Sequence, residues 1–590
     1  MTDDLSQKEI LKLPIKSSVF VTAPPGFGKT YLMTERISLV LSKNVIRPPN
    51  KILALTFSNA AANELKDRVS ARIREPEKCI DVMTFHTLAF FLLKVYGPLV
   101  GVKRNFLIVD ENKINEFKKD FFQKYLTLTN SPAKDDKNEL FHLVQNYDDW
   151  YKNKFVQMRD EKYPNPELFY QLKKKIQTEF INDENLTFDF LLFKAIELLK
   201  MKPDLKEIYY KKYPLIFADE FQDTNYLQYM FLKEITTSVD SRKRPVFVVG
   251  DKKQAIMKFQ GANPENIEYL IEDFNCIKKE LKKNHRTNSP LVLALTNKLR
   301  NPIDVIPSDI KCKMYFHRTV KDEIERLVNV ITELKCDGTQ MQDICILVPQ
   351  RSTATPIKNA FKERSIEFCM INEFKFDYIS ENYPKLLAEF EKRIRTKTNR
   401  ASVSRVLSFA LKKFYAESMD DDPVLKYLEK FAFKFDSIAY KSKEVWERIQ
   451  QYYNFLQMEI DWVKLIKQEC KNKILISSIH GAKGLEYPHV CMVGIVNYRL
   501  PHTSICGPCS FDRVSNIDTS EGEDLLYVGI SRATTDLSFF YSLEDEQTCK
   551  RRKISCVFTP ILGAISFIDS QNNEYAYNNR EIAPYICSKN

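Results

Sequence analysis

Seven short runs of apolar residues stand out in the pattern of hydrophobic and polar positions, and each indicates a buried strand. The runs are Val19–Val21, Ile52–Leu55, Leu215–Ala218, Val246–Val249, Asp343–Val348, Ile474–Ile476 and Val490–Val493. Continuous apolar runs, without alternation, are typical of parallel strands that helices cover on both faces. The stretch Tyr31–Leu41 has helical spacing instead. The pattern therefore predicts an α/β protein built on parallel sheets.

The segment after the first strand has the composition of a phosphate-binding loop. Residues 23–30 read Ala-Pro-Pro-Gly-Phe-Gly-Lys-Thr and join that strand to the helix, which is the context that such a loop requires. The two prolines have no N–H group, so the donors to phosphate begin at Gly26. Lys29 is expected on the β and γ phosphates, and the Thr30 hydroxyl on Mg²⁺. A chance turn is the alternative, and the flanking strand and helix disfavour it.

Two adjacent carboxylates follow the strand Leu215–Ala218. Asp219 is expected to hold Mg²⁺, directly or through water, and Glu220 to orient and deprotonate the attacking water. Neighbouring carboxylates repel each other unless a cation lies between them. A solvated strand end is the alternative. Beside a phosphate loop, however, the pair predicts hydrolysis of a nucleoside triphosphate.

Further motifs occur in a fixed order along the chain. In sequence order, the set is Leu5–Gln7, Ile52–Arg68, Thr84–Leu88, Asp219–Thr224, Val249–Ile256, Leu281–Thr287, Ser478–Glu486 and Tyr527–Ala533. This series resembles the motif set of the UvrD/Rep/PcrA family of superfamily I DNA helicases. The motifs span nearly the whole chain. The resemblance implies two RecA-like lobes, with ATP bound in the cleft between them.

The resemblance also implies which residues contact ATP. Gln254 would contact the γ phosphate and report its loss. Arg286 and Arg532 would be arginine fingers from the second lobe that neutralise charge on the γ-phosphoryl oxygens. His285 stands where the family usually has Tyr against the adenine ring, and Glu486 would bind the ribose or steady the phosphate contacts. The implied cofactors are ATP and Mg²⁺, and the nucleotide-contacting set is Gln7, Ala23, Pro24, Pro25, Gly26, Phe27, Gly28, Lys29, Thr30, His285 and Glu486.

The same resemblance implies a path for single-stranded DNA across both lobes. Phe57 and Phe259 would offer ring faces on which bases stack. Core packing is the alternative for both, because Phe is most often buried. The polar DNA contacts implied are Thr56, Asn59, Thr84 and His86 from the first lobe, and Ser478 and His480 from the second. Single-stranded DNA and its junctions with duplex DNA are the expected partners.

The resemblance implies two discontinuous lobes, each with a mostly helical insertion, and this division explains the spacing of the motifs. The predicted domains are lobe 1A at 1–105 and 187–275, insertion 1B at 106–186, lobe 2A at 276–372 and 466–545, insertion 2B at 373–465, and a C-terminal extension at 546–590 without an assigned role. Insertion 2B is short beside that of familiar family members, so the chain is identified as a compact member.

Composition adds limits to this picture. A chain of 590 residues with 44% apolar residues suits three to five packed domains, and a net charge of +11 suits a polyanionic partner. The N-terminus is polar and no apolar run approaches about 18 residues, so we expect neither a signal peptide nor a membrane span. Thirteen scattered cysteines suit a reducing, cytoplasmic setting. The pair Cys506 and Cys509 lies in an expected loop, where a redox or zinc role is the weaker interpretation.

The main functional hypothesis is an ATP-dependent translocase that moves 3′ to 5′ on single-stranded DNA and separates duplex DNA. A first alternative is a helicase subunit of a repair or anti-phage defence complex with a partner nuclease, which the short insertion 2B favours. A second is an ATP-gated DNA-binding switch with weak motor activity. It is motivated by Met257, Gln260 and Glu523–Asp524, which depart from the family pattern. An RNA substrate is a third, although Ser478–Glu486 favours DNA.

Overall fold

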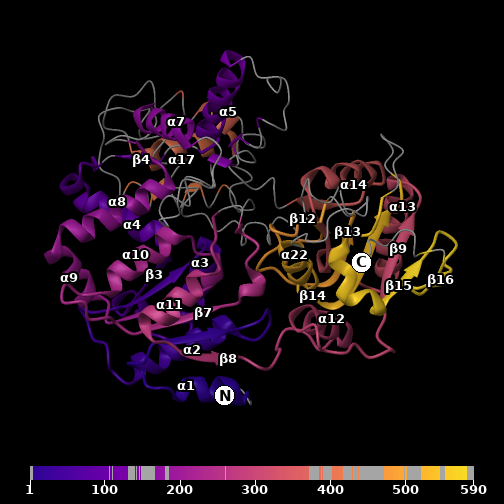
Figure 1. Cartoon of the computed structure of the whole chain (residues 1–590), viewed down its shortest axis with the longest axis horizontal. Coiled ribbons are helices and arrows are strands. Elements are labelled where there is room, and N and C mark those ends of the chain that lie inside the picture. Colours follow the sequence, from indigo (N-terminus) through magenta and orange to yellow (C-terminus); the bar gives the residue numbers. More distant parts are fainter. Residues whose placement is uncertain are drawn as a thin grey trace.

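The computed structural model describes most of residues 4–582, with the longest gaps at 130–139, 148–165, 371–384, 393–401, 416–424, 437–470, 501–519 and 545–551. It contains two large, mainly parallel sheets with helices around them, and a small two-stranded sheet (Figure 1). The predicted α/β class with two parallel-sheet lobes is thus confirmed. Phe259, Gln260, the Cys506–Cys509 pair and most of the predicted insertion 2B lie outside the described residues.

The first lobe is built on a six-stranded sheet in which every pairing is parallel. In spatial order its strands are β3 (Ile80–Thr84), β2 (Ile52–Thr56), β6 (Leu215–Ala218), β7 (Val246–Gly250), β1 (Val19–Thr22) and β8 (Ile277–Glu280). Its helices are α1 (Leu5–Lys12), α2 (Lys29–Ser42), α3 (Asn59–Ser70), α4 (Phe85–Tyr96), α8 (Phe188–Met201), α9 (Pro203–Lys212), α10 (Tyr226–Thr236) and α11 (Asn266–Phe274).

Successive residues of the central strands pack into two different hydrophobic cores. Phe20 and Val248 join the cluster that includes α4, α8 and α10. Val19, Val21 and Val249 join the cluster formed with α2 and α3 on the other face. Both faces of the sheet are therefore covered, which explains why these strands are apolar at every position.

The described part of the predicted insertion 1B is mostly helical. It contains α5 (Glu111–Leu128) and α7 (Pro166–Glu179), which share a small aromatic core around Phe122, Tyr147 and Phe169. A two-stranded parallel sheet of β4 (Leu107–Ile108) and β5 (Asn185–Leu186) marks where the chain leaves and re-enters the first lobe.

The second lobe is built on an eight-stranded sheet. In spatial order its strands are β11 (Phe368–Met370), β12 (Ile474–Ser478), β10 (Ile344–Val348), β13 (Tyr487–Val493), β14 (Ala533–Ser542), β9 (Cys312–His317), β15 (Ile565–Ile568) and β16 (Glu574–Tyr575). Only the last pairing, between β15 and β16, is antiparallel. Its helices are α12 (Pro290–Arg300), α13 (Val320–Cys336), α14 (Arg351–Glu363) and α22 (Ser520–Ile530); α17 (Val403–Tyr415) lies in the predicted insertion 2B.

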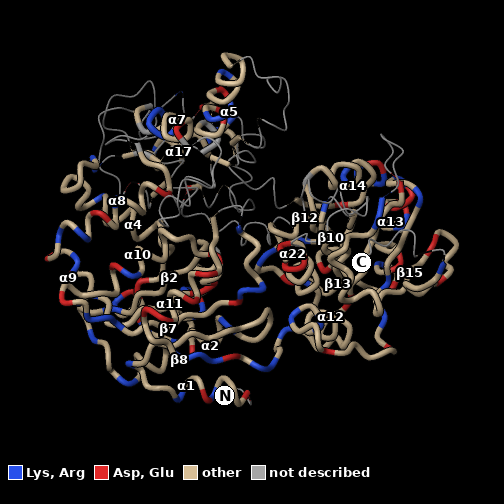
Figure 2. The backbone as a smooth tube through the Cα atoms, in the orientation of Figure 1, with Lys and Arg blue, Asp and Glu red and all other residues tan. Residues whose placement is uncertain are grey.

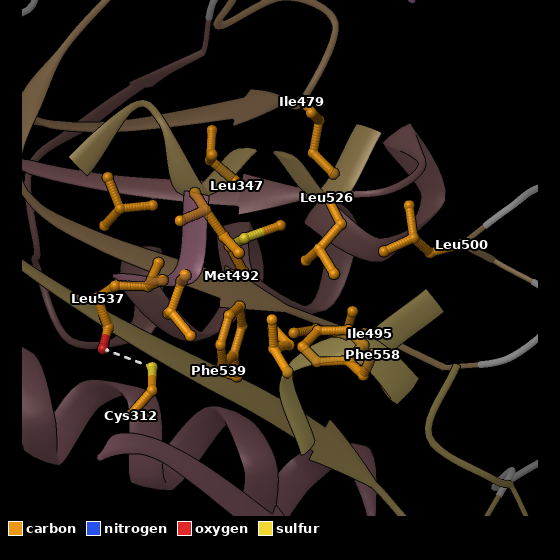
Figure 3. Packing of buried hydrophobic residues seen from close by; sticks show 14 of the residues in the cluster. Cys312, Leu347, Ile479, Met492, Ile495, Leu500, Leu526, Leu537, Phe539 and Phe558 are labelled. Carbon is orange, nitrogen blue, oxygen red and sulfur yellow. Dashed lines mark hydrogen bonds between the residues drawn. The ribbon is translucent and has the colours of Figure 1, made fainter. Parts of the chain in front are cut away.

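The predicted C-terminal extension contributes to the second sheet. Strand β15 pairs with β9, with Ile565 opposite Cys312. Phe558, from the 3₁₀ segment before β15, packs edge-to-face on Phe539 of β14, 4.9 Å between ring centroids. Figure 3 shows both rings among the buried apolar side chains of this core. The predicted boundary between lobes 1A and 2A falls after residue 275. Strand β8 pairs with β1, however, so residues 277–280 lie in the first sheet.

Lys and Arg positions and Asp and Glu positions are interspersed along the backbone of both lobes (Figure 2). Among the described residues, no helix combines the length and apolarity needed to cross a bilayer.

Candidate active site

The loop after β1 turns tightly over the start of α2. Gly26 and Gly28 have φ angles of 83° and 84°, in the left-handed region that favours glycine. A Cβ atom on Gly26 would lie 2.6 Å from the Cβ of Arg286, and one on Gly28 would lie 2.7 Å from Nε2 of Gln7. The loop is therefore pressed between α1 and the segment that follows β8, and only glycine fits at both positions.

Lys29, the first residue of α2, points at the acidic end of β6. Its Nζ lies 2.7 Å from Oε1 of Glu220 and 3.4 Å from Oε1 of Gln254. Asp219 accepts the N–H of Glu220 on Oδ1 at 2.9 Å. The predicted phosphate-binding lysine, both carboxylates and Gln254 are thus brought together at one edge of the first sheet, and Thr30 lies next to them in the first turn of α2.

The two carboxylates have opposite electrostatic environments. Burial, reinforced by the neighbouring Glu220, raises the pKa of Asp219. Burial also disfavours the charge of Glu220, but the ammonium groups of Lys29 and Lys483 outweigh it and lower the pKa of Glu220. A cation placed beside Asp219 would relieve its burial cost. The residues present therefore fit a Mg²⁺–nucleotide, with one carboxylate to ligate the metal and one to act as a base.

Residues predicted to contact the base lie against the same loop. Nε2 of Gln7 donates to the carbonyl oxygen of Phe27 at 3.3 Å, and the N–H of His285 donates to that of Gly26 at 2.7 Å. The His285 ring is held by Asp4, 3.0 Å between Nε2 and Oδ2. Sequence reasoning missed Asp4. The available signal was its place three residues before Gln7, where it caps the N-terminus of α1.

A chain of hydrogen bonds joins the acidic pair to the end of β7. Gln222 donates from Nε2 to Oε2 of Glu220 at 2.6 Å, and its Oε1 accepts the N–H of Asp251 at 2.9 Å. Asp251 in turn accepts from Nε2 of Gln254 at 2.9 Å. The same Gln254 nitrogen lies 3.4 Å from the carbonyl oxygen of Ala23, at the start of the phosphate loop. The orientation of Gln254 is thus fixed by Asp251.

Two cations from the second lobe bind carboxylates of the first lobe. Nζ of Lys483 lies 2.7 and 2.6 Å from the two carboxylate oxygens of Asp223 and donates to the carbonyl oxygen of Gln254 at 2.6 Å. Nη1 of Arg300 lies 3.0 Å from each carboxylate oxygen of Asp251. Sequence reasoning assigned no role to either cation. Lys483 lies within a quoted motif, which was a usable signal, whereas Arg300 lies outside every motif.

The two predicted arginine fingers both lie where the two lobes meet, Arg286 at a small crevice beside the phosphate loop and Arg532 near Glu220. Nε of Arg286 is 2.6 Å from Oε2 of Glu486, and Nη1 donates to the carbonyl oxygen of Ser531 at 3.2 Å. Arg532 is buried, and its Nε and Nη1 each donate to a backbone carbonyl of the second lobe at 3.0 Å. Burial lowers the pKa of Arg532 to about 9, and Arg286 acts in the same direction.

The first-lobe residues predicted to contact DNA gather at the carboxyl ends of β2 and β3. Thr56 and Thr84 are direct neighbours in the register of these two strands. Phe57 is half-buried after β2, and Asn59 begins α3. His86, in the first turn of α4, packs edge-to-face on Phe188 at 5.2 Å between ring centroids, and burial lowers its pKa to about 4. His86 is therefore neutral at physiological pH.

The second-lobe residues predicted to contact DNA follow β12. The hydroxyl of Ser478 accepts the N–H of Gly481 at 3.1 Å. His480 forms a hydrogen bond with the backbone of Ile256 in the first lobe, and burial, with Lys483 nearby, lowers the pKa of His480. The turn after β12 thus approaches the first lobe with both His480 and Lys483.

Comparison with known proteins agrees with this arrangement. Residues 4–275 match the model of the UvrD/REP helicase N-terminal domain, and segments 279–421 and 377–544 match that of the UvrD-like helicase C-terminal domain. The ATP-dependent DNA helicase PcrA of Staphylococcus aureus Mu50 is 26% identical over 382 residues, which cover 63% of this chain but only 51% of that protein. PcrA of Staphylococcus epidermidis ATCC 12228 is 24% identical over 608 residues, covering 88% and 82% of the two chains.

The chain therefore spans about half the length of the S. aureus relative that it matches. The two domain models together extend over both lobes; the first match ends at residue 275 and the second begins at residue 279, within β8. The chain belongs to the UvrD/Rep family of DNA helicases.

Proposed function

We propose that this protein is an ATP-driven motor that moves 3′ to 5′ on single-stranded DNA and separates duplex DNA ahead of it. The observation that carries the proposal is the contact of Lys29 with Glu220 and Gln254 at an edge of the first lobe that cations of the second lobe also reach. The residues proposed to act on the γ phosphate therefore have contacts in both lobes. A change at the phosphate can then change how the lobes are held together.

In this proposal the phosphates bind to Lys29 and to the N–H groups from Gly26 onward. Glu220, kept ionised by Lys29, orients the attacking water and accepts its proton. Thr30 and Asp219 hold Mg²⁺, which neutralises charge on the phosphates when bound. Gln7, His285 and Glu486 contact the nucleoside, and Gln254 contacts the γ phosphate.

The two arginines have different tasks in this proposal. Arg286, whose Cβ already lies against the position that a Gly26 side chain would occupy, is the better placed of the two to meet the phosphates. Arg532 is held by carbonyl oxygens of its own lobe, so its guanidinium reaches the γ phosphate only if closure brings the second lobe nearer. Charge from these groups would stabilise the transition state more than the ground state.

The DNA path runs over the carboxyl ends of β2 and β3 and across to the turn after β12. Thr56, Asn59, Thr84 and Ser478 would meet the backbone, and half-buried Phe57 would stack on a base. Because His86 and His480 both have lowered pKa values, their contacts to DNA would be made by neutral imidazoles. The contribution of these two histidines to the protein's affinity for DNA is then expected to be insensitive to pH between about 7 and 8.

The test is DNA-stimulated ATP hydrolysis by Lys29→Ala and Glu220→Gln. We expect Lys29→Ala to lose nucleotide binding, and Glu220→Gln to bind ATP normally while kcat falls by about 100-fold or more, the usual range for a lost general base. Lys43→Ala, at the exposed far end of α2, is the matched control. Normal turnover in either site variant would disprove the assignment.

Polarity needs its own experiment. Strand displacement is measured on duplexes that carry a single-stranded tail on only the 3′ or only the 5′ side. Unwinding that requires the 3′ tail supports the proposal. A requirement for the 5′ tail would reverse the direction, and ATP-dependent DNA binding without displacement of either substrate would leave an ATP-gated switch in place of a motor.

A further inference from the structure

We propose that Arg300 of α12 is a positioning residue that couples the orientation of Gln254 to the closure of the two lobes. The inference rests on the proposed ATPase function and adds a residue to it that lies outside all of the sequence motifs. It starts from one ion pair. Arg300 from the second lobe binds Asp251 of the first lobe directly behind Gln254.

The ion pair has the geometry of a specific, partly buried interaction. Nη1 of Arg300 lies 3.0 Å from each Asp251 oxygen, and Nη2 donates to Oε1 of Glu280 at 3.2 Å. The Asp251 side chain is only 2% exposed. Tyr527, from the motif at the end of α22, adds a hydrogen bond to the same guanidinium. Charge-assisted bonds of this kind hold a side chain in one orientation more strongly than neutral ones do.

Asp251 in turn determines how Gln254 is turned. One Asp251 oxygen accepts from the Gln254 amide nitrogen at 2.9 Å, and the other accepts the N–H of Lys253 at 3.3 Å. With its nitrogen held there, the Gln254 amide presents its oxygen to Lys29 at 3.4 Å. Arg300 therefore shares one carboxylate with the residue that faces the expected γ phosphate.

Arg300 also lines a small cavity beside the phosphate loop, together with Pro24, Pro25 and Arg286. A direct contact with phosphate is therefore the competing role for this residue. The contacts argue against it, because both terminal nitrogens of Arg300 already bind carboxylates, on Asp251 and Glu280. The charge of Arg300 is paired with carboxylates of the first lobe, and Arg286 lies nearer to Gly26 of the phosphate loop.

The consequence is that the presence of a γ phosphate is coupled to the contact between the lobes through Gln254, Asp251 and Arg300, and not through the phosphate loop. If Gln254 turns from Lys29 toward a γ phosphate, the hydrogen bond from its amide nitrogen to Asp251 is weakened or lost. The Asp251 carboxylate is then free to bind Arg300 more strongly or in another orientation. By the reciprocity of coupled equilibria, strengthening the Arg300 contact must equally favour one orientation of Gln254. We expect the main effect on turnover and stepping, because Arg300 bonds to Asp251 and Glu280 and not to Lys29.

The experiment compares Arg300→Met, which keeps the apolar stem without the charge, with Lys298→Met as a matched control on the same helix. Lys298 contacts only the carbonyl oxygen of Pro302 among its described hydrogen bonds, away from the first lobe. ATP affinity is measured with a fluorescent ATP analogue, together with kcat, KM and translocation rate on single-stranded DNA. We expect Arg300→Met to lower DNA-stimulated kcat and translocation by about tenfold, within the usual range of coupling energies, with ATP affinity changed by less than about twofold.

Each other outcome has a defined meaning. An equal loss of ATP affinity would overturn the inference and make Arg300 a phosphate ligand, and unchanged kcat and translocation would overturn it outright. Arg300→Lys is the second variant, and it decides by the same criteria if Arg300→Met does not fold. Lysine keeps the charge but loses the planar two-point contact, so an intermediate loss is expected and wild-type behaviour would count against the inference. An inactive wild-type enzyme would refute the proposed function instead.

Discussion

Replacing Lys483 with methionine should destabilise the protein in a strongly pH-dependent way. Its ammonium group contacts both oxygens of Asp223, whose side chain is 2% exposed. Burial raises the pKa of Asp223 from 3.8 to about 6, even though Lys483 acts to lower it. The folded state therefore binds this proton more tightly than the unfolded state, and the contribution of Asp223 to stability falls as the pH rises from 3.8 through about 6.

The size of the effect can be worked out from this shift. At about 1.4 kcal/mol per pKa unit, ionised Asp223 already costs the wild-type fold about 3 kcal/mol at neutral pH. Without Lys483 the pKa rises further, but proton uptake limits the additional cost. That limit is about 1 kcal/mol at pH 7, about 3 kcal/mol at pH 8 and close to zero at pH 5. Loss of the hydrogen bond to the carbonyl oxygen of Gln254 adds about 1 kcal/mol that does not depend on pH.

The assay is urea or thermal unfolding of wild type and Lys483→Met at pH 5, 7 and 8. The difference in stability should grow with pH as above. In an Asp223→Asn background, where the carboxyl group that pairs with Lys483 is absent, the same substitution should lose most of its pH dependence. A difference that is the same at all three pH values, or that persists with its pH dependence in the Asp223→Asn background, would refute the assignment of Lys483 as the partner of a buried carboxylate.

Two further predictions concern the nucleotide side of the crevice. Gly26→Ala should destabilise the fold by about 1–2 kcal/mol, the cost of a non-glycine residue in a left-handed conformation. It should also weaken ATP binding, because the new Cβ would meet Arg286. An unchanged melting temperature together with unchanged affinity for a fluorescent ATP analogue would contradict this. Arg36→Met should lower stability by about 2–4 kcal/mol, because the buried guanidinium donates to three carbonyls at 2.7–2.8 Å that follow and end α1. It should also raise KM for ATP through displacement of Gln7, and a stability loss with normal KM would separate the two effects.

Much of the fold could be predicted because its strands are apolar at every position, a signal carried by local sequence alone. The phosphate loop and the acidic strand end were likewise local patterns, and parallel strands place their carboxyl ends at one edge, so Lys29 and Glu220 were expected together. The partners of Asp223 and Asp251 could not be predicted in the same way. Each pairs with a cation more than 40 residues away, and which cation arrives depends on how two separately folded sheets are docked.

Arg532 illustrates the same limit within a motif. Its motif identified it as a cation for the nucleotide, but the structure surrounds it with backbone carbonyls of its own lobe. Those acceptors come from backbone groups, which every residue type carries, so no sequence pattern distinguishes them. The position of β15 in the second sheet was hidden for a related reason, because an apolar run does not specify the strand with which it pairs.

That strand has a consequence for synthesis in the cell. All strands of the first sheet lie before residue 281, whereas the second sheet requires β15 at Ile565–Ile568 to cover β9. A ribosome adds about 5–20 residues per second. The amino-terminal lobe can therefore fold many seconds before β15 is synthesised, and during that time the edge of β9 that carries Cys312 and Met314 has no partner strand. The nascent carboxy-terminal lobe therefore exposes one unpaired edge of β9 until β15 is synthesised, and a chain that ended before β15 would keep that edge exposed.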